Sequence, residues 1–223
     1  MKFFQIIRYW FYITFKFGGR IGLFTFYYEL RGERRYHLNS TAFNNLKELN
    51  LQGNQLVHAT FYMPVSYFTM EQLLTHLPED ARKGSFLDIG CGKGRAMCMA
   101  AHSGFTKVKG IDFAKELIEA AEKNLERTKE DYPALSYELL WKDVTALTID
   151  KDVSTVFLFN PFDEVLMKTV VQKIRVSLQT DPRPFYVLYA SPRHEELFFA
   201  EGYDVIFRVK KFDYLEGVIF NNR

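Results

Sequence analysis

The sequence contains few cysteines and little excess charge of either sign, and both absences exclude classes of protein. Its 223 residues include two cysteines, Cys91 and Cys98, which are too few for a disulfide framework and lack the paired spacing of a zinc site. The 29 Lys and Arg nearly balance the 27 Asp and Glu, so the whole molecule has no positive field that favours nucleic acid. We therefore expect a reducing compartment, the cytoplasm, with no structural metal and no strong nucleic-acid signal.

The amino terminus also lacks the features of a leader or a membrane span. An apolar stretch follows Lys2, but Arg8 and Lys16 interrupt it and no small-residue cleavage site follows. A spanning helix needs about 20 predominantly apolar residues. We expect neither a signal peptide nor a transmembrane helix in this segment.

Residues 1–36 are instead basic and aromatic, with seven Lys and Arg against two Glu, 7 − 2 = +5. Helical spacing gives an amphipathic helix that ends near Gly18-Gly19. Its helical positions form an apolar face (Phe3, Ile6, Trp10, Ile13, Phe17) and a polar face (Gln5, Arg8, Tyr12, Lys16). Three roles stay open: packing on the domain, peripheral contact of residues 1–19 with an anionic membrane surface, or a nucleic-acid arm.

From about residue 68 the pattern alternates between helix and strand, which predicts a doubly wound α/β fold. The last two strands are joined by a short polar link, which predicts an antiparallel hairpin. We expect a mostly parallel seven-stranded sheet with helices on both faces in residues 61–223, preceded by a helical extension in residues 1–60. The predicted strands are 85–89, 107–111, 136–141, 153–159, 185–190, 203–209 and 215–220, and the predicted helices are 67–77, 95–102, 115–127 and 164–178.

The most informative segment is a glycine loop between the first strand and the helix that follows it. It reads Asp88-x-Gly90-x-Gly92-x-Gly94. In doubly wound sheets ligands bind outside the carboxyl ends of the strands, and glycine lets the backbone approach them closely. A dinucleotide-binding fingerprint would need a third glycine where Arg95 stands, so an NAD-dependent oxidoreductase is disfavoured.

The loop resembles motif I of the class I S-adenosylmethionine (AdoMet)-dependent methyltransferases, and the resemblance extends over about residues 60–221. It implies AdoMet as the cofactor, with the backbone of Gly90 and Gly92 at its amino-acid end and Asp88 holding its ammonium group. Asp112, at the end of the second strand, can accept both ribose hydroxyls, or it can cap the next helix.

Two further residues complete the expected cofactor site. Asp143, after the third strand, stands where similar methyltransferases place a side chain against the adenine amino group; the alternative is a solvated turn. The segment from Tyr62 to Ser66 resembles the part of lysine methyltransferases that folds over AdoMet, which implies a cofactor contact for Tyr62. Ser66 also suits the cap of the following helix.

The fourth strand is followed by Asn160-Pro161-Phe162, the expected acceptor site. This sequence resembles a shortened Asn/Asp-Pro-Pro-Tyr/Phe motif of methyltransferases that act on amino nitrogen. The resemblance implies that the Asn160 amide and the adjacent carbonyl accept hydrogen bonds from the substrate, with Phe162 beside a methylammonium-like charge. A strand-end turn stiffened by one proline is the alternative. Asp163 and Tyr189 are the available bases, and His194 is interpreted as a helix-start or surface residue.

These features predict an AdoMet-dependent methyltransferase acting on an amino group, with protein lysine among the candidate acceptors. Two alternatives remain. One is an enzyme that methylates a small molecule and uses residues 1–60 as a lid. The other is a noncatalytic AdoMet-binding module at a membrane surface. The identity of the methyl acceptor is not encoded in any spacing that we identify.

Overall fold

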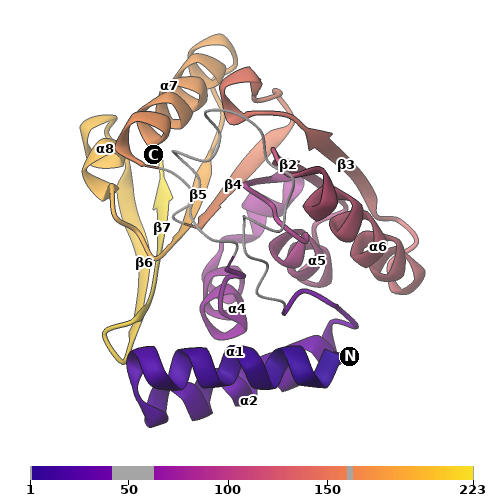
Figure 1. Cartoon of the computed structure of the whole chain (residues 1–223). Coiled ribbons are helices and arrows are strands. Elements are labelled where there is room, and N and C mark those ends of the chain that lie inside the picture. Colours follow the sequence, from indigo (N-terminus) through magenta and orange to yellow (C-terminus); the bar gives the residue numbers. More distant parts are fainter. Residues whose placement is uncertain (1, 42–62, 160–162, 223) are drawn as a thin grey trace.

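A twisted seven-stranded sheet forms the centre of the computed structural model, which describes residues 2–41, 63–159 and 163–222 (Figure 1). Its strand order is β3-β2-β1-β4-β5-β7-β6. The first five strands run parallel, whereas β7 is antiparallel to both β5 and β6. The predicted fold class is therefore confirmed. The strands are β1 (Ser85–Ile89), β2 (Lys107–Asp112), β3 (Ser136–Trp141), β4 (Val153–Phe159), β5 (Tyr186–Ala190), β6 (Asp204–Lys211) and β7 (Leu215–Asn221).

Successive residues of the central strands are buried on opposite faces, as the period of two requires. In β1, Phe86 packs in one hydrophobic cluster and Leu87 in the other. In β4, Phe157 joins the cluster of Phe86, while Val156 joins that of Leu87. The strands β1, β4 and β5 are buried along almost their whole length because helices cover both faces.

The helices form two layers, one on each face (Figure 1). One layer contains α4 (Tyr67–His76), α5 (Arg95–His102) and α6 (Lys115–Asp131), whose residues Leu73 and Leu125 lie in the cluster of Phe86. The other contains α7 (Glu164–Thr180) and α8 (Glu195–Ala200), which bring Met167 and Phe198 to the opposite cluster. Two short 3₁₀ helices, η2 (Glu79–Lys83) and η3 (Val144–Ala146), complete the connections.

The amino-terminal residues form a helical hairpin of α1 (Lys2–Phe17) and α2 (Gly19–Arg35). The predicted break is confirmed: Gly18, with φ +91°, separates the helices, although α2 itself was not predicted. Trp10 lies opposite Phe26, and a Cβ on Gly22 would overlap Thr14, so the two helices run antiparallel at close range.

The hairpin packs beside the carboxyl ends of the parallel strands, where it meets α4 and the turn between β6 and β7 (Figure 1). The Phe24 ring lies 5.3 Å from that of Phe68 and 5.2 Å from that of Phe212. Ile13 is fully buried. One face of the hairpin therefore packs on the domain. Among the helices of the described ranges, none combines the length and the apolar character needed to cross a bilayer.

The structure corrects one local prediction, the capping role of Ser66. Ser66 occupies the N-cap position of α4, but its side chain makes no cap hydrogen bond; its backbone carbonyl accepts from Met70 N at 3.0 Å instead. His194 stands at the N-cap position of α8, which confirms its interpretation as a helix-start residue, although α8 was not among the predicted helices. The expected boundary between residues 60 and 61 falls in segment 42–62, outside the described residues, and stays a prediction.

Candidate active site

The glycine loop owes its alternating pattern to its backbone conformation. Gly90, Gly92 and Gly94 have φ angles of +81°, +52° and +73°, which residues with side chains rarely adopt. Cys91 and Lys93, between them, are buried. Burial raises the pKa of the Cys91 thiol well above its ordinary value, in accord with a packing role for this residue. The three glycines therefore turn the chain from β1 into α5 without placing a side chain at the strand edge.

The tip of β2 holds this loop in place. The carbonyl of Ile111 accepts hydrogen bonds from Gly90 N at 2.9 Å and from Cys91 N at 3.0 Å. The Asp112 carboxylate accepts from Gly92 N at 2.9 Å through Oδ2. The loop and Asp112 thus form one rigid unit at the carboxyl edge of the sheet.

Asp112 is buried, and both of its oxygens contact backbone amides. Its Oδ1 accepts from Ala114 N at 2.9 Å, but Ala114 rather than Asp112 occupies the N-cap position of α6. The helix-cap alternative is therefore wrong. Burial raises the pKa of the Asp112 carboxyl to about 6, although the amides of Ala114 and Gly92 act in the opposite direction.

Asp88 is a second buried carboxyl group beside the first. Only 3% of the residue is exposed, and burial, with the nearby charge of Asp112, raises its pKa well above the ordinary value. Within the described residues, no hydrogen-bond donor or cation is paired with this side chain. A buried carboxyl without a partner is costly unless a ligand supplies one, and a cationic ammonium group fits that need.

Asp143 lies at the same edge, after β3. Its Oδ1 accepts from Thr145 N at 2.8 Å and from Thr145 Oγ1 at 2.7 Å, which caps the short helix η3. The side chain is partly exposed. This geometry is the one expected for the alternative role of Asp143 in a solvated turn. A contact with the adenine amino group would use the capacity of the carboxylate to accept further hydrogen bonds.

A small cavity of about 20 Å³ lies where β4 and β5 end. Phe159, Ala190 and Ser191 line it from the sheet, and Thr25 of α2 lines it from the amino-terminal hairpin. Thr25 is 5% exposed, and its Oγ1 has no hydrogen-bond partner among the described residues. The cavity has room for about one water-sized group. The rest of its lining comes from Met63, Pro64, Val65, Ser66, Thr69, Tyr214 and Leu215.

The two available bases have other roles in this geometry. Asp163 caps α7, since its Oδ1 accepts from Leu166 N at 3.0 Å. Tyr189 is fully buried, and burial raises the pKa of its phenol. A phenol with a raised pKa stays protonated at neutral pH, which makes Tyr189 a poor base.

A buried ion pair behind the glycine loop forms a part of the site that was not predicted from the sequence. Arg95, the first residue of α5, is 3% exposed and donates to both oxygens of Glu29 in α2, at 2.9 and 2.7 Å. It also donates to the carbonyl of Val65 at 2.7 Å and lies 3.9 Å from the centre of the Tyr67 ring. The helix that begins at the cofactor loop is therefore clamped to the amino-terminal hairpin.

A second glutamate of α2 extends this network. Glu33 Oε1 accepts from the backbone amides of Ser40 and Thr41, each at 2.9 Å, and lies 3.5 Å from Arg95. Arg95 also donates to the hydroxyls of Ser40 and Thr41, each at 2.8 Å. A signal existed in the sequence: the only two acidic residues in positions 1–36 lie four apart, on one face of a helix.

Four of the predicted site residues lie outside the described residues, namely Tyr62, Asn160, Pro161 and Phe162. Their roles stay predictions. The structure brings together the other six, with Asp88, Gly90, Gly92, Gly94 and Asp112 around one loop and Asp143 at the adjacent strand end.

Comparisons with known proteins bear on the type of domain and on the fold. Residues 86–181, from β1 to just past α7, match the family model of a methyltransferase domain. No curated protein matches the chain.

Solved structures share the fold at low sequence identity. The N-methyltransferase NodS from Bradyrhizobium japonicum WM9 is 17% identical, with a TM-score of 0.53 over 69% of this chain and 93% of that one. Magnesium protoporphyrin IX methyltransferase from Synechocystis PCC 6803, solved with bound AdoMet, is 14% identical, with a TM-score of 0.52 over 70% and 79%. A putative RNA methyltransferase from Pyrococcus horikoshii is 16% identical, with a TM-score of 0.53 over 86% and 93%. Residues 86–181 therefore match a methyltransferase domain, and the sheet with its two helix layers has the Rossmann-like fold of these methyltransferase structures.

Proposed function

We propose that this methyltransferase binds AdoMet at the glycine loop and transfers its methyl group to an amino nitrogen. The observation that carries the cofactor part is the pair of buried carboxyls, Asp88 and Asp112, at the tips of adjacent strands around the loop. Asp88 pairs with the ammonium group of the cofactor and Asp112 with the ribose hydroxyls. Gly90 and Gly92 leave room for the amino-acid end, and Asp143 accepts a hydrogen bond from the adenine amino group.

The acceptor part of the proposal rests on the end of β4. Asn160-Pro161-Phe162 follows Phe159 directly in the sequence, and Phe159 lines the cavity beside β5. A cavity of about 20 Å³ with mostly apolar walls suits one slender group better than a ring. In this proposal, Asn160 and the adjacent carbonyl accept hydrogen bonds from the acceptor amine. Phe162 contacts the amine once it is methylated.

The reaction is an in-line displacement. AdoMet supplies an electrophilic methyl group on a sulfonium centre. An amine lone pair would take this methyl group in line with the C–S bond, whose electrons would stay on sulfur, and the ammonium product would then lose a proton to water. The protein orients the reactants and excludes water, which contributes several kcal/mol. The ammonium form of the acceptor loses its proton to solvent before the neutral amine enters the cavity.

Replacing Asn160 by alanine tests the acceptor assignment. We expect turnover to fall by about 100-fold, because one well-oriented hydrogen-bonding group at the reacting atom is lost, with the Kd for AdoMet unchanged within about threefold. Asn39→Ala is the matched control, since the side chain of Asn39 is exposed outside the site. Lost cofactor affinity with normal turnover at saturation would contradict the assignment.

The acceptor class is found by incubating the protein and methyl-labelled AdoMet with a cell extract, using Asp112→Ala as the inactive reference. Label in protein supports an amine acceptor such as lysine and permits identification of the target. Label only in small molecules favours the alternative enzyme. Cofactor binding without any labelled product favours the noncatalytic alternative.

Binding of AdoMet is expected to release a proton from Asp88. Burial raises the pKa of this carboxyl in the free protein, whereas an ammonium group beside it would lower that pKa by favouring the ionised form. Affinity should therefore rise with pH until the free protein is itself ionised. Isothermal titration calorimetry in phosphate and in Tris should give different apparent enthalpies. The Asp88→Asn variant should bind more weakly and lose the buffer dependence; equal enthalpies for the wild type would contradict the proposal.

A further inference from the structure

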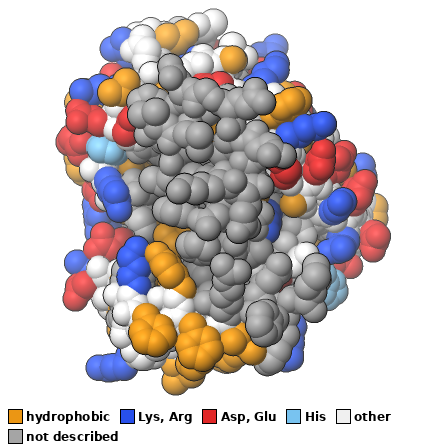
Figure 2. Space-filling model, in the orientation of Figure 1, with side chains coloured by type: hydrophobic (Ala, Val, Ile, Leu, Met, Phe, Trp, Pro, Cys, Tyr) orange, Lys and Arg blue, Asp and Glu red, His pale blue; other side chains and the backbone are white. Residues whose placement is uncertain are grey.

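The amino-terminal hairpin is apolar on two sides, which an ordinary amphipathic helix is not. Its inner side packs Phe24 against Phe68 and Phe212 of the domain. Its outer side exposes Phe11, Phe15, Leu23 and Tyr27, which are 50%, 87%, 66% and 59% exposed. Figure 2 shows hydrophobic side chains gathered at the bottom of the molecule, where Figure 1 places this hairpin. These four residues, together with Arg20 and Arg34, are called the outer face below.

The outer face follows helical geometry on both helices. Phe11 and Phe15 are four residues apart on α1, and their rings stack 6.5 Å apart. On α2, Arg20, Leu23, Tyr27 and Arg34 are spaced by three, four and seven residues, so they share one stripe. An apolar stripe that faces solvent on two packed helices marks an interaction surface rather than scattered exposure.

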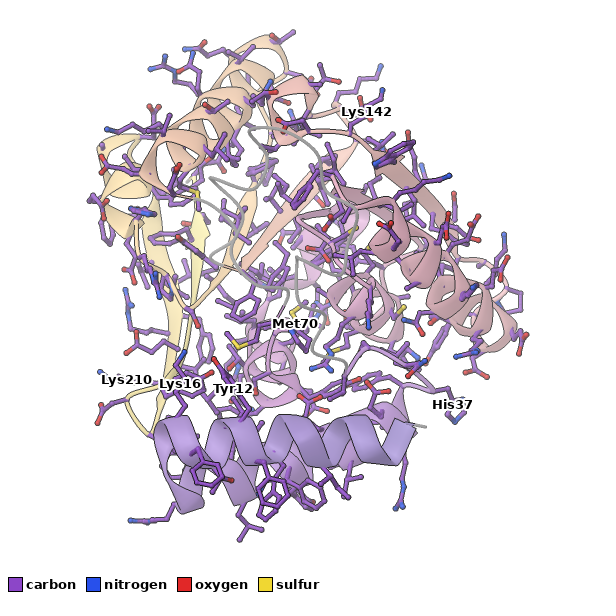
Figure 3. All side chains as sticks on the ribbon, viewed as in Figure 1. Tyr12, Lys16, His37, Met70, Lys142 and Lys210 are labelled. Carbon is purple, nitrogen blue, oxygen red and sulfur yellow. The ribbon has the colours of Figure 1, made fainter. Side chains whose placement is uncertain are left out.

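Two of the side chains predicted to form the polar face of α1 do not belong to the outer face. Tyr12 and Lys16 lie on the side of α1 nearer the domain, close to Lys210 near the end of β6 (Figure 3). Lys16 Nζ donates to Tyr12 Oη at 3.0 Å and lies 5.4 Å from the centre of the Tyr12 ring. Lys210 is ion-paired with Asp213 at 3.2 Å and with Glu216 at 3.0 Å, so this side of the hairpin does not face a purely basic surface.

The buried ion pair removes negative charge from the outer face. Glu29 and Glu33 are the only acidic residues in positions 1–36, and both turn inward to Arg95. Arg20 and Arg34 are exposed. The outer face is consequently aromatic and purely basic, even though its helix contains two glutamates.

We infer that the outer face docks the protein on an anionic lipid bilayer. Aromatic and leucine side chains sink into the boundary between headgroups and acyl chains, while arginines beside them contact lipid phosphates. A second copy of the chain fits less well, because two outer faces would bring arginines of like charge together. On its inner side, α2 contributes Thr25 to the cavity at the end of β4, so docking places the candidate acceptor site near the bilayer. The inference does not rest on the proposed acceptor.

The test is co-sedimentation of the full chain with vesicles of phosphatidylcholine alone or mixed with phosphatidylglycerol. We expect binding to the mixed vesicles, much weaker binding to phosphatidylcholine alone, and loss of binding as salt is added. Phe15→Ser combined with Leu23→Ser should lower the partition coefficient by about tenfold or more, because two apolar groups no longer leave water. Arg20→Gln combined with Arg34→Gln should lower it by about tenfold on mixed vesicles only.

The matched control removes exposed apolar side chains elsewhere. Val176 of α7 and Ile206 of β6 are 50% and 42% exposed, and Val176→Ser with Ile206→Ser should pellet like the wild type. Equal pelleting of the Phe15/Leu23 variant, or no pelleting of the wild type, would overturn the inference. So would a wild-type dimer in sedimentation velocity without lipid that the Phe15/Leu23 variant converts to monomer, since a second copy would then cover the outer face.

Discussion

Replacing Asp112 by alanine is expected to weaken AdoMet binding by at least about 100-fold. A carboxylate that accepts two ribose hydroxyls makes two hydrogen bonds to a charged group, each contributing about 1.5–3 kcal/mol. Together they correspond to a change of about 100-fold or more in Kd. The same substitution also frees Gly92 N, which Asp112 holds at 2.9 Å, so the loop loses its anchor as well as a ligand contact.

Isothermal titration calorimetry with AdoMet measures this loss, and Asp152→Ala is the matched control. Asp152 is also a carboxylate at a strand end, where it accepts from Ser85 Oγ at 2.6 Å, but it lies at the opposite edge of the sheet. We expect the control to keep wild-type affinity. If Asp112→Ala binds as the wild type does, the cofactor does not lie across the tip of β2, and the proposed site is wrong.

Removing Glu29 is expected to lower the free energy of unfolding by about 3–5 kcal/mol, because it leaves the buried Arg95 charge without its main partner. For a chain of this size that loss corresponds to a fall in Tm of about 10 °C. Burial lowers the pKa of Arg95, but the intrinsic pKa of arginine is so high that the side chain keeps its charge when Glu29 is removed, and the cost is not relieved by loss of a proton. Thermal denaturation of Glu29→Ala followed by circular dichroism measures the effect.

Two variants separate the buried pair from a general effect of losing a glutamate. Glu119→Ala removes the partner of Lys115 on α6, where both side chains are more than half exposed, and should change stability by less than about 0.5 kcal/mol. Arg95→Met combined with Glu29→Leu should be less destabilising than Glu29→Ala, because neither charge is left alone. If the double variant loses as much free energy of unfolding as the two single variants lose together, the two side chains do not act as a pair.

The sheet and the cofactor loop were predictable because their signals are local. The five parallel strands are short apolar runs followed by polar or glycine-rich turns, and β1, β3 and β4 begin and end at the predicted residues. The loop depends on glycine at alternate positions, and the three positive φ angles explain why no other residue type serves. Helix ends were less certain: α6 continues to Asp131 and α7 to Thr180, two to four residues beyond the predicted ends.

The contacts between distant segments were not predictable from local patterns. In the sequence, Arg95 was used only as evidence against a dinucleotide-binding fingerprint, because it stands where the third glycine would be. In the structure it pairs with Glu29, 66 positions earlier. The positive charge of residues 1–36 was apparent in the sequence. The sequence did not show that both glutamates turn inward and leave an entirely basic outer face. Thr25 and its place beside Phe159 likewise follow from the packing of α2, which no periodicity specifies.

The pairing of α2 with Arg95 has a consequence for synthesis on the ribosome. Chains emerge amino terminus first, so Glu29 and Glu33 leave the exit tunnel before their cationic partner has been translated. The hairpin then carries carboxylates with no partner on one side and exposed aromatic rings on the other. Only after the glycine loop and Arg95 have emerged can α2 be fixed in place. The earliest segment of the chain is therefore among the last to reach its final environment, and nascent chains that stop before residue 95 should be especially sensitive to proteases.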